Sequence, residues 1–273
     1  FFYENEYEHK NVRAEFIKKG YDLIPIINRK MRVKKILRLI DFLEEKKYKK
    51  INQLKEVQAV IMAGGLGTRL LPFTEVLPKP LVPINGKPVL SYILDSFEKY
   101  GVSRFWLTLN YKSLLIKSYL KETKFKSKIT FYEEKKPLGT VGALKYLSNK
   151  LSNDFLLTNC DTVINTNFFE ILKFHKKNKN DITIVASLKK FRIPYGICEL
   201  DTENRFVEIS EKPNLNFLTN TGLYVLNKKI LKLIPRKKYD MTDLIKKAKN
   251  QKSKIGVFPI NESSWMDIGN WNE

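Results

Sequence analysis

The stretch of sequence that decides the fold is residues 57–83, VQAVIMAGGLGTRLLPFTEVLPKPLVP. Its first part, Val57–Met62, is a short apolar run with β-branched residues, which is typical of a buried parallel strand. Three glycines follow directly, so backbone N–H groups can turn toward an anion without obstruction by a Cβ atom. They are Gly64, Gly65 and Gly67. Arg69 and Lys79 add positive charge, and the stretch therefore predicts a strand followed by a phosphate-binding loop.

Two better-known phosphate loops are excluded. The third glycine of a dinucleotide fingerprint would fall at Leu70, and no G-K-[ST] sequence closes the loop as in a Walker motif. A single glycine-rich turn is weak evidence of function. Here G-G-x-G-T-R is followed by P-K-P, with Lys79 ten residues after Arg69, and this combination is far more specific.

Outward from this stretch, apolar runs alternate with segments of helical periodicity. We expect helices at residues 88–100, 112–120 and 140–147 and strands at 104–109, 129–132 and 155–159. This alternation indicates βαβ units and a parallel sheet covered on both faces. Beyond residue 181 we expect strands at 182–188, 195–201, 207–210, 221–226 and 255–259 and a helix at 242–249.

The N-terminal segment has a different pattern. A helix from Asn11 to Gly20, a strand at 23–27, a turn at 28–30, a strand at 33–39 and a helix at 40–47 are expected. This order resembles the closing half of a CBS motif, and an ordinary αββα extension remains an equal alternative. Residues 46–56 are a plausible linker, so we divide the chain into a CBS-like fragment with its linker, 1–56, and a main domain, 57–273. The chain starts with Phe1 instead of methionine, so we expect it to begin partway into a longer product.

Composition narrows the function further. Hydrophobic residues make up 43% of the 273 residues, which is too many for a disordered chain, and no apolar run is long enough to span a membrane. Two cysteines cannot form a disulfide scaffold, so we expect a reducing, cytoplasmic setting. The net charge of +21 suggests a polyanionic partner, but the lysines are dispersed and no nucleic-acid-binding motif occurs. We therefore expect no nucleic-acid and no membrane partner.

Six further motifs follow the glycine loop in order: PLGTVGA at 137–143, NCD at 159–161, YG at 195–196, EKP at 211–213, NTGLY at 220–224 and WMDIG at 265–269. With that loop, they resemble the sugar-1-phosphate nucleotidyltransferases, which join a nucleoside triphosphate to a sugar 1-phosphate and release pyrophosphate. The resemblance covers nearly all of residues 57–273. It implies an α/β fold with a mixed, mainly parallel Rossmann-like sheet flanked by helices, preceded here by the small α+β CBS-like fragment.

The resemblance also implies roles for individual residues. The residues that it implies for nucleotide binding are Ala63, Gly64, Gly65, Gly67 and Thr68, and those for catalysis are Arg69 and Lys79. The residues that it implies for binding the sugar phosphate are Gly139, Thr140, Gly196, Glu211, Lys212, Asn220 and Thr221. The metal ligands are Asp161 and Asp267, with Mg²⁺ as the cofactor. Two departures stand out: Cys160 replaces a glycine common in relatives, and the chain ends four residues after Gly269.

Elementary chemistry agrees with these residue types. Two polyanions must approach each other, so the site needs cations and carboxylates that hold them, and Mg²⁺ prefers oxygen ligands. A sugar phosphate is already a nucleophile at neutral pH, so no general base is required. We accordingly expect both His9 and His175 at the surface, and Cys160 as a small buried residue at a strand end.

The sequence gives little information on which nucleotide base and which sugar the protein uses. A CBS-like segment joined to such a transferase resembles the glucosamine-1-phosphate guanylyltransferases of legionaminic acid biosynthesis, which favours GTP and glucosamine 1-phosphate. A uridylyl-, thymidylyl- or cytidylyltransferase for another hexose 1-phosphate is the near alternative. A non-catalytic nucleotide-sensing module could dispense with Asp161 or Asp267, and both are present. A homo-oligomer and nucleotide regulation through the CBS-like segment stay open.

Overall fold

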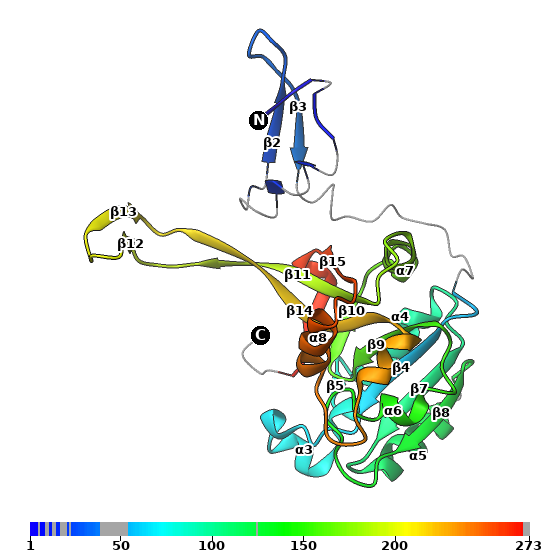
Figure 1. Cartoon of the computed structure of the whole chain (residues 1–273). Helices are drawn as coiled ribbons and strands as arrows, with labels where there is room; N and C mark the ends of the chain where they lie inside the picture. The colour runs from blue at the N-terminus through cyan, green and yellow to red at the C-terminus, as the bar shows by residue number, and fades with distance from the viewer. Residues whose placement is uncertain are drawn as a thin grey trace. The chain divides into compact units, whose positions relative to one another are not determined.

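A computed structural model of the chain describes residues 1–4, 6–8, 11–12, 15–16, 21, 23–38, 54–123 and 125–269. The chain divides into two compact units, each described here by itself (Figure 1). The first unit contains residues 1–46, 187–219 and 259–262. The second contains residues 47–186, 220–258 and 263–273.

A seven-stranded sheet is the main feature of the fold, with the strand order β15-β11-β14-β9-β4-β7-β8 (Figure 1). Strands β4, β7, β8 and β9 are parallel, and β14 is antiparallel to β9. Helices flank the sheet, which confirms the expected mixed, mainly parallel α/β architecture. The strands are β4 Gln58–Ala63, β7 Arg104–Leu109, β8 Lys128–Glu133, β9 Asp154–Asn159, β11 Ile182–Arg192, β14 Asn214–Asn227 and β15 Ile255–Ile260.

Burial on both faces explains why the first of these strands reads as a continuous apolar run. Ala59, Val60 and Ile61 of β4 are completely buried. Ala59 lies opposite Phe105 of β7 on one side and Leu156 of β9 on the other, so β4 is the central parallel strand. Because the carboxyl ends of parallel strands share one sheet edge, the loops after β4, β7, β8 and β9 gather there.

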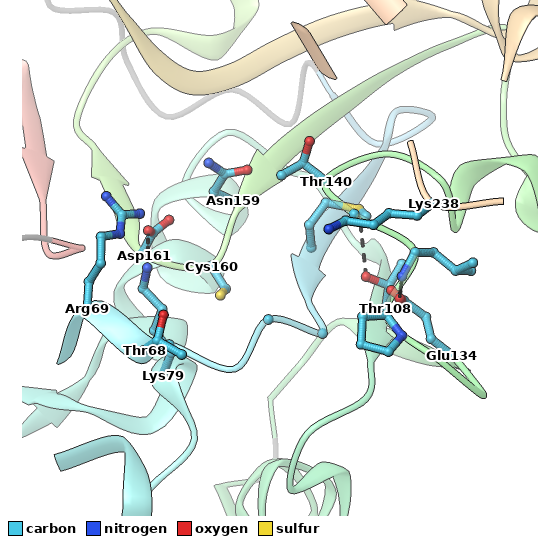
Figure 2. A pocket seen from close by; sticks show the side chains of 17 residues that line it. Thr68, Arg69, Lys79, Thr108, Glu134, Thr140, Asn159, Cys160, Asp161 and Lys238 are labelled. Atoms are coloured by element: carbon cyan, nitrogen blue, oxygen red, sulfur yellow. Dashed lines mark hydrogen bonds and ion pairs between the residues drawn. The ribbon is translucent and has the colours of Figure 1, made fainter. Parts of the chain in front are cut away.

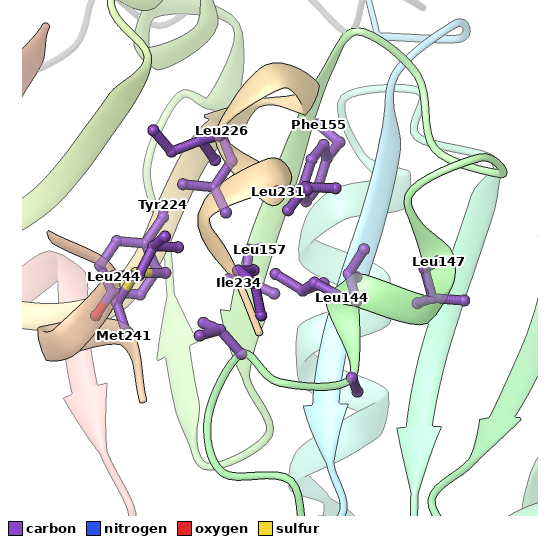
Figure 3. Close-up of a cluster of buried hydrophobic side chains, with 14 of the residues drawn as sticks. Leu144, Leu147, Phe155, Leu157, Tyr224, Leu226, Leu231, Ile234, Met241 and Leu244 are labelled. Carbon is purple, nitrogen blue, oxygen red and sulfur yellow. The ribbon is translucent and has the colours of Figure 1, made fainter. Parts of the chain in front are cut away.

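Buried apolar side chains lie on five of the helices below, whereas the apolar side chains of the sixth, Phe73 and Val76 of α3, are exposed. The helices are α3 Phe73–Val76, α4 Val89–Glu98, α5 Ser113–Thr123, α6 Leu144–Leu147, α7 Phe168–Lys177 and α8 Met241–Asn250, with short 3₁₀ segments η1 Thr68–Leu70, η2 Lys79–Leu81, η3 Lys228–Leu233 and η4 Glu262–Ser264. In Figure 3, side chains of α6, η3 and α8 meet those of β9 and β14 in one buried cluster. This core fixes α6 and η3 beside the strand ends.

The helix expected at residues 140–147 is shorter than its pattern indicated. Only Leu144–Leu147 is α-helical, and residues 139–143 form turns. Gly139 has φ +77°, and a Cβ atom on Gly142 would lie 2.2 Å from the Leu138 carbonyl oxygen, so the chain is held in a tight turn before the helix. The apolar periodicity in this region therefore reflects burial of a loop.

Small sheets complete the fold. Strands β10 Thr162–Ile164 and β16 Trp265–Asp267 form an antiparallel pair, as do β5 Pro83–Ile84 and β6 Lys87–Pro88. In the first unit, β12 Ile197–Leu200 and β13 Phe206–Ser210 form an antiparallel hairpin. None of the helices within the described ranges is both long enough and apolar enough to traverse a bilayer.

The first unit also contains the three-stranded sheet β1-β2-β3, made of Phe2–Tyr3, Leu23–Ile27 and Val33–Arg38. Strands β2 and β3 are antiparallel, and β1 is parallel to β2. The Asn28 side chain accepts the N–H groups of Lys30 and Arg32, which closes the expected turn. The helix expected at 40–47 and most of the linker lie outside the described residues, and the likeness to a CBS motif stays a prediction.

Candidate active site

The glycine loop joins β4 to η1 at the edge where the parallel strands end. A Cβ atom on Gly64 would lie 2.9 Å from Oε1 of Glu134, and one on Gly67, at φ +73°, would lie 2.8 Å from the Thr74 methyl group. The Thr74 hydroxyl donates to the Gly67 carbonyl at 3.0 Å. A Cβ atom on Gly65 would have no neighbouring heavy atom within 4 Å. The loop thus packs closely on two sides and faces open space on the third.

A pocket of about 320 Å³ occupies that space, and its two ends differ in chemistry. Figure 2 shows Arg69, Lys79 and Asp161 together at one end. Glu134 and Thr108 lie at the other end, together with Lys238. We refer to these as the phosphate end and the base end of the pocket.

Two aspartates that lie 106 residues apart in sequence meet at the phosphate end. Asp161 follows β9, and β16 pairs with β10 so that Asp267 lies opposite Thr162. The Ile268 N–H donates to the Asp161 carbonyl at 2.9 Å, which locks the register. A Cβ atom on Gly269 would lie 2.8 Å from Asp161 Oδ2 and 2.9 Å from Asp267 Oδ1, so the two carboxylates converge on one point.

Lys79 completes this cluster. Its side chain is buried and forms an ion pair with Asp161, which is also buried. The position of a Cβ atom on Gly269 lies 3.2 Å from the Lys79 ammonium nitrogen as well. Buried charges are stable only when paired, so the pair holds both side chains in place beside the glycine loop.

The donor set at this end fits a divalent cation. Mg²⁺ is usually bound through one or two carboxylates together with phosphate oxygens of the substrate, and Asp161 and Asp267 supply two. No group of three His, Cys, Asp or Glu side chains gathers in the part of the chain that the structure describes.

Glu134 dominates the base end, and the sequence reasoning missed it. It is only 6% exposed, and its Oε2 accepts the Leu138 N–H at 2.9 Å. Burial raises the pKa of the Glu134 carboxyl, while hydrogen bonds from the Leu138 N–H and the Thr108 side chain oppose that rise. The available signal was an acidic residue just after the strand expected at 129–132, separated from the P-L-G-T motif by two lysines.

The loop after Leu138 is joined to residues 239–241 by hydrogen bonds. The Thr140 N–H donates to Asp240 Oδ1 at 2.8 Å, and the Met241 N–H donates to the Thr140 hydroxyl at 2.8 Å. A Cβ atom on Gly139 would lie 2.7 Å from the Tyr239 carbonyl oxygen. These contacts place Lys238, a second residue missed from the sequence, in the pocket wall.

Nine of the expected site residues line the pocket: Gly64, Gly65, Gly67, Thr68, Arg69, Lys79, Gly139, Thr140 and Asp161. Asn220 and Thr221 are bonded within the sheet instead, to the Tyr224 hydroxyl at 2.6 Å and the Val185 carbonyl at 2.8 Å. Ala63 is a buried end residue of β4. A role in substrate binding stays a prediction for these three.

Asp267 lies beside Asp161 but is not among the residues that line the pocket, and the three other expected residues belong to the first unit. A Cβ atom on Gly196 would lie 2.9 Å from Glu211 Oε2, so the YG and EKP motifs are adjacent on the hairpin. Glu211 and Lys212 form an exposed ion pair at 3.7 Å. Their assignment to the sugar phosphate stays a prediction.

The structure corrects the expectation for His175. This side chain is almost completely buried, with Nδ1 2.9 Å from the Thr183 hydroxyl and Nε2 3.5 Å from Asp154. The helical period of α7 turns position 175 inward, which the surrounding lysines had obscured. Cys160 is buried at a strand end, as expected, and burial raises its pKa to about 12. His9 lies outside the described residues.

Several known proteins are similar in sequence to this chain. The chain is 34% identical over 223 residues to mannose-1-phosphate guanyltransferase 2 of Candida glabrata, an alignment that covers 78% of this chain and 61% of that protein. It is 32% identical over 225 residues to the bifunctional protein GlmU of Methanococcus maripaludis, covering 78% and 51%. The chain therefore spans about three-fifths or less of the length of these relatives.

Among solved structures, HddC from Yersinia pseudotuberculosis aligns with a TM-score of 0.63 and 29% identity, covering 79% of this chain and 95% of that one. HddC complexed with GMP-PN aligns with a TM-score of 0.62. The sequence profile described as "Nucleotidyl transferase" matches residues 58–273, which contain every part of the pocket. The chain belongs to the nucleotidyl transferase family.

Proposed function

We propose that this protein transfers a nucleotidyl group from a nucleoside triphosphate to a sugar 1-phosphate and releases pyrophosphate. The observation that carries the proposal is the convergence of Asp161, Asp267 and Lys79 beside an anion-binding glycine loop. The names of the relatives, which include several mannose-1-phosphate guanyltransferases, support the same reaction class.

Each group at the phosphate end has a role in this reaction. An oxygen of the sugar phosphate attacks the α-phosphorus, and the bond from that phosphorus to the bridging oxygen breaks, so that pyrophosphate leaves with the electron pair. Arg69 and Lys79 stabilise the negative charge that develops on the phosphates. A Mg²⁺ ion held by Asp161 and Asp267 would supply further charge neutralisation between the two anions.

Glu134 supports GTP as the nucleotide. Its buried carboxylate is an acceptor at the end of the pocket away from Arg69 and Lys79. Guanine presents two adjacent donors, the N1–H and the exocyclic N2 amine, which one carboxylate can accept together. Bases that lack this pair would leave a buried acceptor unmatched, which is costly. The HddC complex with GMP-PN and the guanyltransferase relatives agree with this choice.

The sugar we propose is glucosamine 1-phosphate. This proposal rests on the CBS-like segment joined to the transferase domain, which resembles the guanylyltransferases of legionaminic acid biosynthesis. The relatives named for mannose 1-phosphate make that sugar the first competitor. Glu211 and Lys212 of the hairpin are the residues we propose for contact with the sugar phosphate.

The test is a substrate panel. The protein is incubated with Mg²⁺, each of GTP, UTP, CTP, ATP and dTTP, and glucosamine, mannose or glucose 1-phosphate, and pyrophosphate is followed. We expect kcat/KM for GTP to lead by at least about tenfold, which corresponds to about 1.4 kcal/mol of transition-state preference. UTP or dTTP in first place would contradict the guanylyl proposal, and no pyrophosphate with any pair would contradict the transferase.

A further inference from the structure

A second cavity in the second unit has a wall rich in lysine. It has a volume of about 400 Å³, lies beside α6 and η3, and is lined by Lys145, Lys228, Lys229 and Lys232 among others. We call it the lysine cavity. We propose that it binds a phosphate-bearing anion and that this anion orders the adjoining wall of the nucleotide pocket.

Most of the positive charge in the lysine cavity is uncompensated. Lys229 is paired with Asp181 at 2.5 Å. The Lys145 ammonium donates to a carbonyl oxygen, that of Leu231, at 3.5 Å, so its charge is not neutralised. Within the described ranges, Lys228 and Lys232 have no carboxylate within ion-pair distance. Ammonium groups around one cavity repel each other. A phosphate, with its negative charge and several acceptor oxygens, would attract each of them and offset that repulsion.

The wall of the lysine cavity is held by directional hydrogen bonds. Asn227 Nδ2 donates to Asp154 Oδ1 at 2.8 Å, and Asn227 Oδ1 accepts the Lys229 N–H at 3.1 Å. The Lys228 N–H donates to the Asn153 carbonyl at 2.6 Å. Asp154 in turn lies against the buried His175. The backbone that carries the lysines is therefore fixed, which lowers the entropic cost of gathering them around an anion.

The size of the cavity limits the ligand. About 400 Å³ lies within the range of small-molecule sites, and it exceeds what one phosphate group fills. The side chains of Asn149, Asn153 and Ser148 add amide and hydroxyl groups to the lining. A diphosphate, free or carrying an organic substituent, matches this combination of charge and neutral polar groups.

The two elements beside the lysine cavity continue directly into the nucleotide pocket. Lys145 follows Thr140 by five residues, and Lys232 precedes Lys238 by six. Between the cavities the segments are joined by backbone hydrogen bonds, from the Val141 N–H to the Tyr239 carbonyl at 3.1 Å and from the Tyr239 N–H to the Leu138 carbonyl at 2.9 Å. An anion that holds Lys145 and Lys232 together would restrain both segments and hence Thr140 and Lys238.

The binding test uses inorganic pyrophosphate, titrated calorimetrically into the full chain in EDTA. We expect the double variant Lys228→Glu/Lys232→Glu to bind one pyrophosphate fewer than the unmodified protein. The matched control Lys121→Glu/Lys126→Glu makes the same charge change on exposed lysines outside the cavity and should bind the same number. An unchanged count in the first variant, or an equal loss in both, overturns the proposal. If the glutamate pair fails to fold by circular dichroism, Lys228→Gln/Lys232→Gln replaces it.

Parallel titrations compare inorganic phosphate with GDP at the site that is lost in the lysine variant. Tighter binding of GDP would show that an organic substituent contributes to the affinity, and tighter binding of phosphate would show that it does not. The count of sites does not depend on turnover, so failure of the proposed transferase reaction and failure of this proposal are distinguishable.

The coupling has its own readout. We expect phosphate to change the KM for GTP about fivefold in the unmodified protein and in the control, and to lose that effect in Lys228→Glu/Lys232→Glu. The same phosphate response in all three proteins would show only competition in the nucleotide pocket and would overturn the coupling.

Discussion

The phosphate end and the base end of the pocket differ in how their charged groups are arranged. At the phosphate end, strand pairing brings Asp161 and Asp267 to one point, and Lys79 joins them through its ion pair with Asp161. At the base end, a single carboxylate, Glu134, is buried and accepts a backbone hydrogen bond, and we propose it as the acceptor for the base. Charge neutralisation requires only that ions be close, whereas base discrimination requires that the wrong base leave acceptor capacity of a buried group unmatched. Loss of an ion should therefore stop the chemistry, and loss of Glu134 should relax the choice of base.

The largest expected effect is at the phosphate end. Asp161→Asn and Asp267→Asn should each lower kcat by about a thousandfold or more, since each removes a carboxylate from the proposed ion site. Pyrophosphate release with Mg²⁺ measures the loss, and thermal unfolding checks that the fold persists.

Asp95→Asn is the matched control for these variants. It breaks another Lys–Asp ion pair, that of Lys87 with Asp95, which is partly exposed and outside the pocket lining. Its turnover should stay within about twofold of the unmodified enzyme, because such pairs contribute little. Near-normal activity of Asp161→Asn or Asp267→Asn would show that the two-aspartate site is wrong.

The next effect concerns the base end. Glu134→Gln keeps the size of the side chain but replaces one carboxylate oxygen with an amide donor, so kcat/KM for GTP should fall by about 10- to 100-fold while that for UTP changes far less. Glu133→Gln, at an exposed neighbour bonded to Lys117, is the control and should preserve the GTP preference. Equal losses with GTP and UTP in Glu134→Gln would move Glu134 out of base recognition.

The next prediction tests whether the sugar is recognised by residues outside the two ends of the pocket. Glu211→Ala should raise the KM for the sugar 1-phosphate about tenfold and leave the KM for GTP nearly unchanged, because we assign Glu211 to the sugar phosphate and not to the nucleotide. Glu203→Ala, another exposed glutamate of the first unit, should change neither. If Glu211→Ala raised both KM values equally, the EKP motif would not be specific to the sugar.

The smallest effect is on stability against pH. Because burial raises the folded-state pKa of Glu134 above its ordinary value of 4.5, the folded protein keeps this proton when the unfolded chain has already released it. The free energy of unfolding should therefore fall as pH rises from about 4.5 through the raised pKa. Urea unfolding across that window should show a shallower fall for Glu134→Gln than for the unmodified protein. Identical profiles would contradict the raised pKa.

The sequence was sufficient for the parts of this site that are local. The glycine loop, the buried strand before it and Arg69 belong to one continuous stretch, in which the period of apolar residues and the backbone freedom of glycine leave few alternatives. Residues 137–140 and 159–161 of two further motifs also line the pocket, because they lie at or after the ends of strands that share one sheet edge.

Tertiary structure alone decided the rest. Local sequence does not reveal that Glu134 is buried or that Lys145 and Lys232 share a cavity, because burial and charge density depend on which segments pack together. Asp161 and Asp267 were named from the sequence by resemblance, yet only the β10–β16 pairing brings their carboxylates to one point. Local sequence specifies backbone preference and side-chain type, whereas proximity between distant residues is a property of the folded chain.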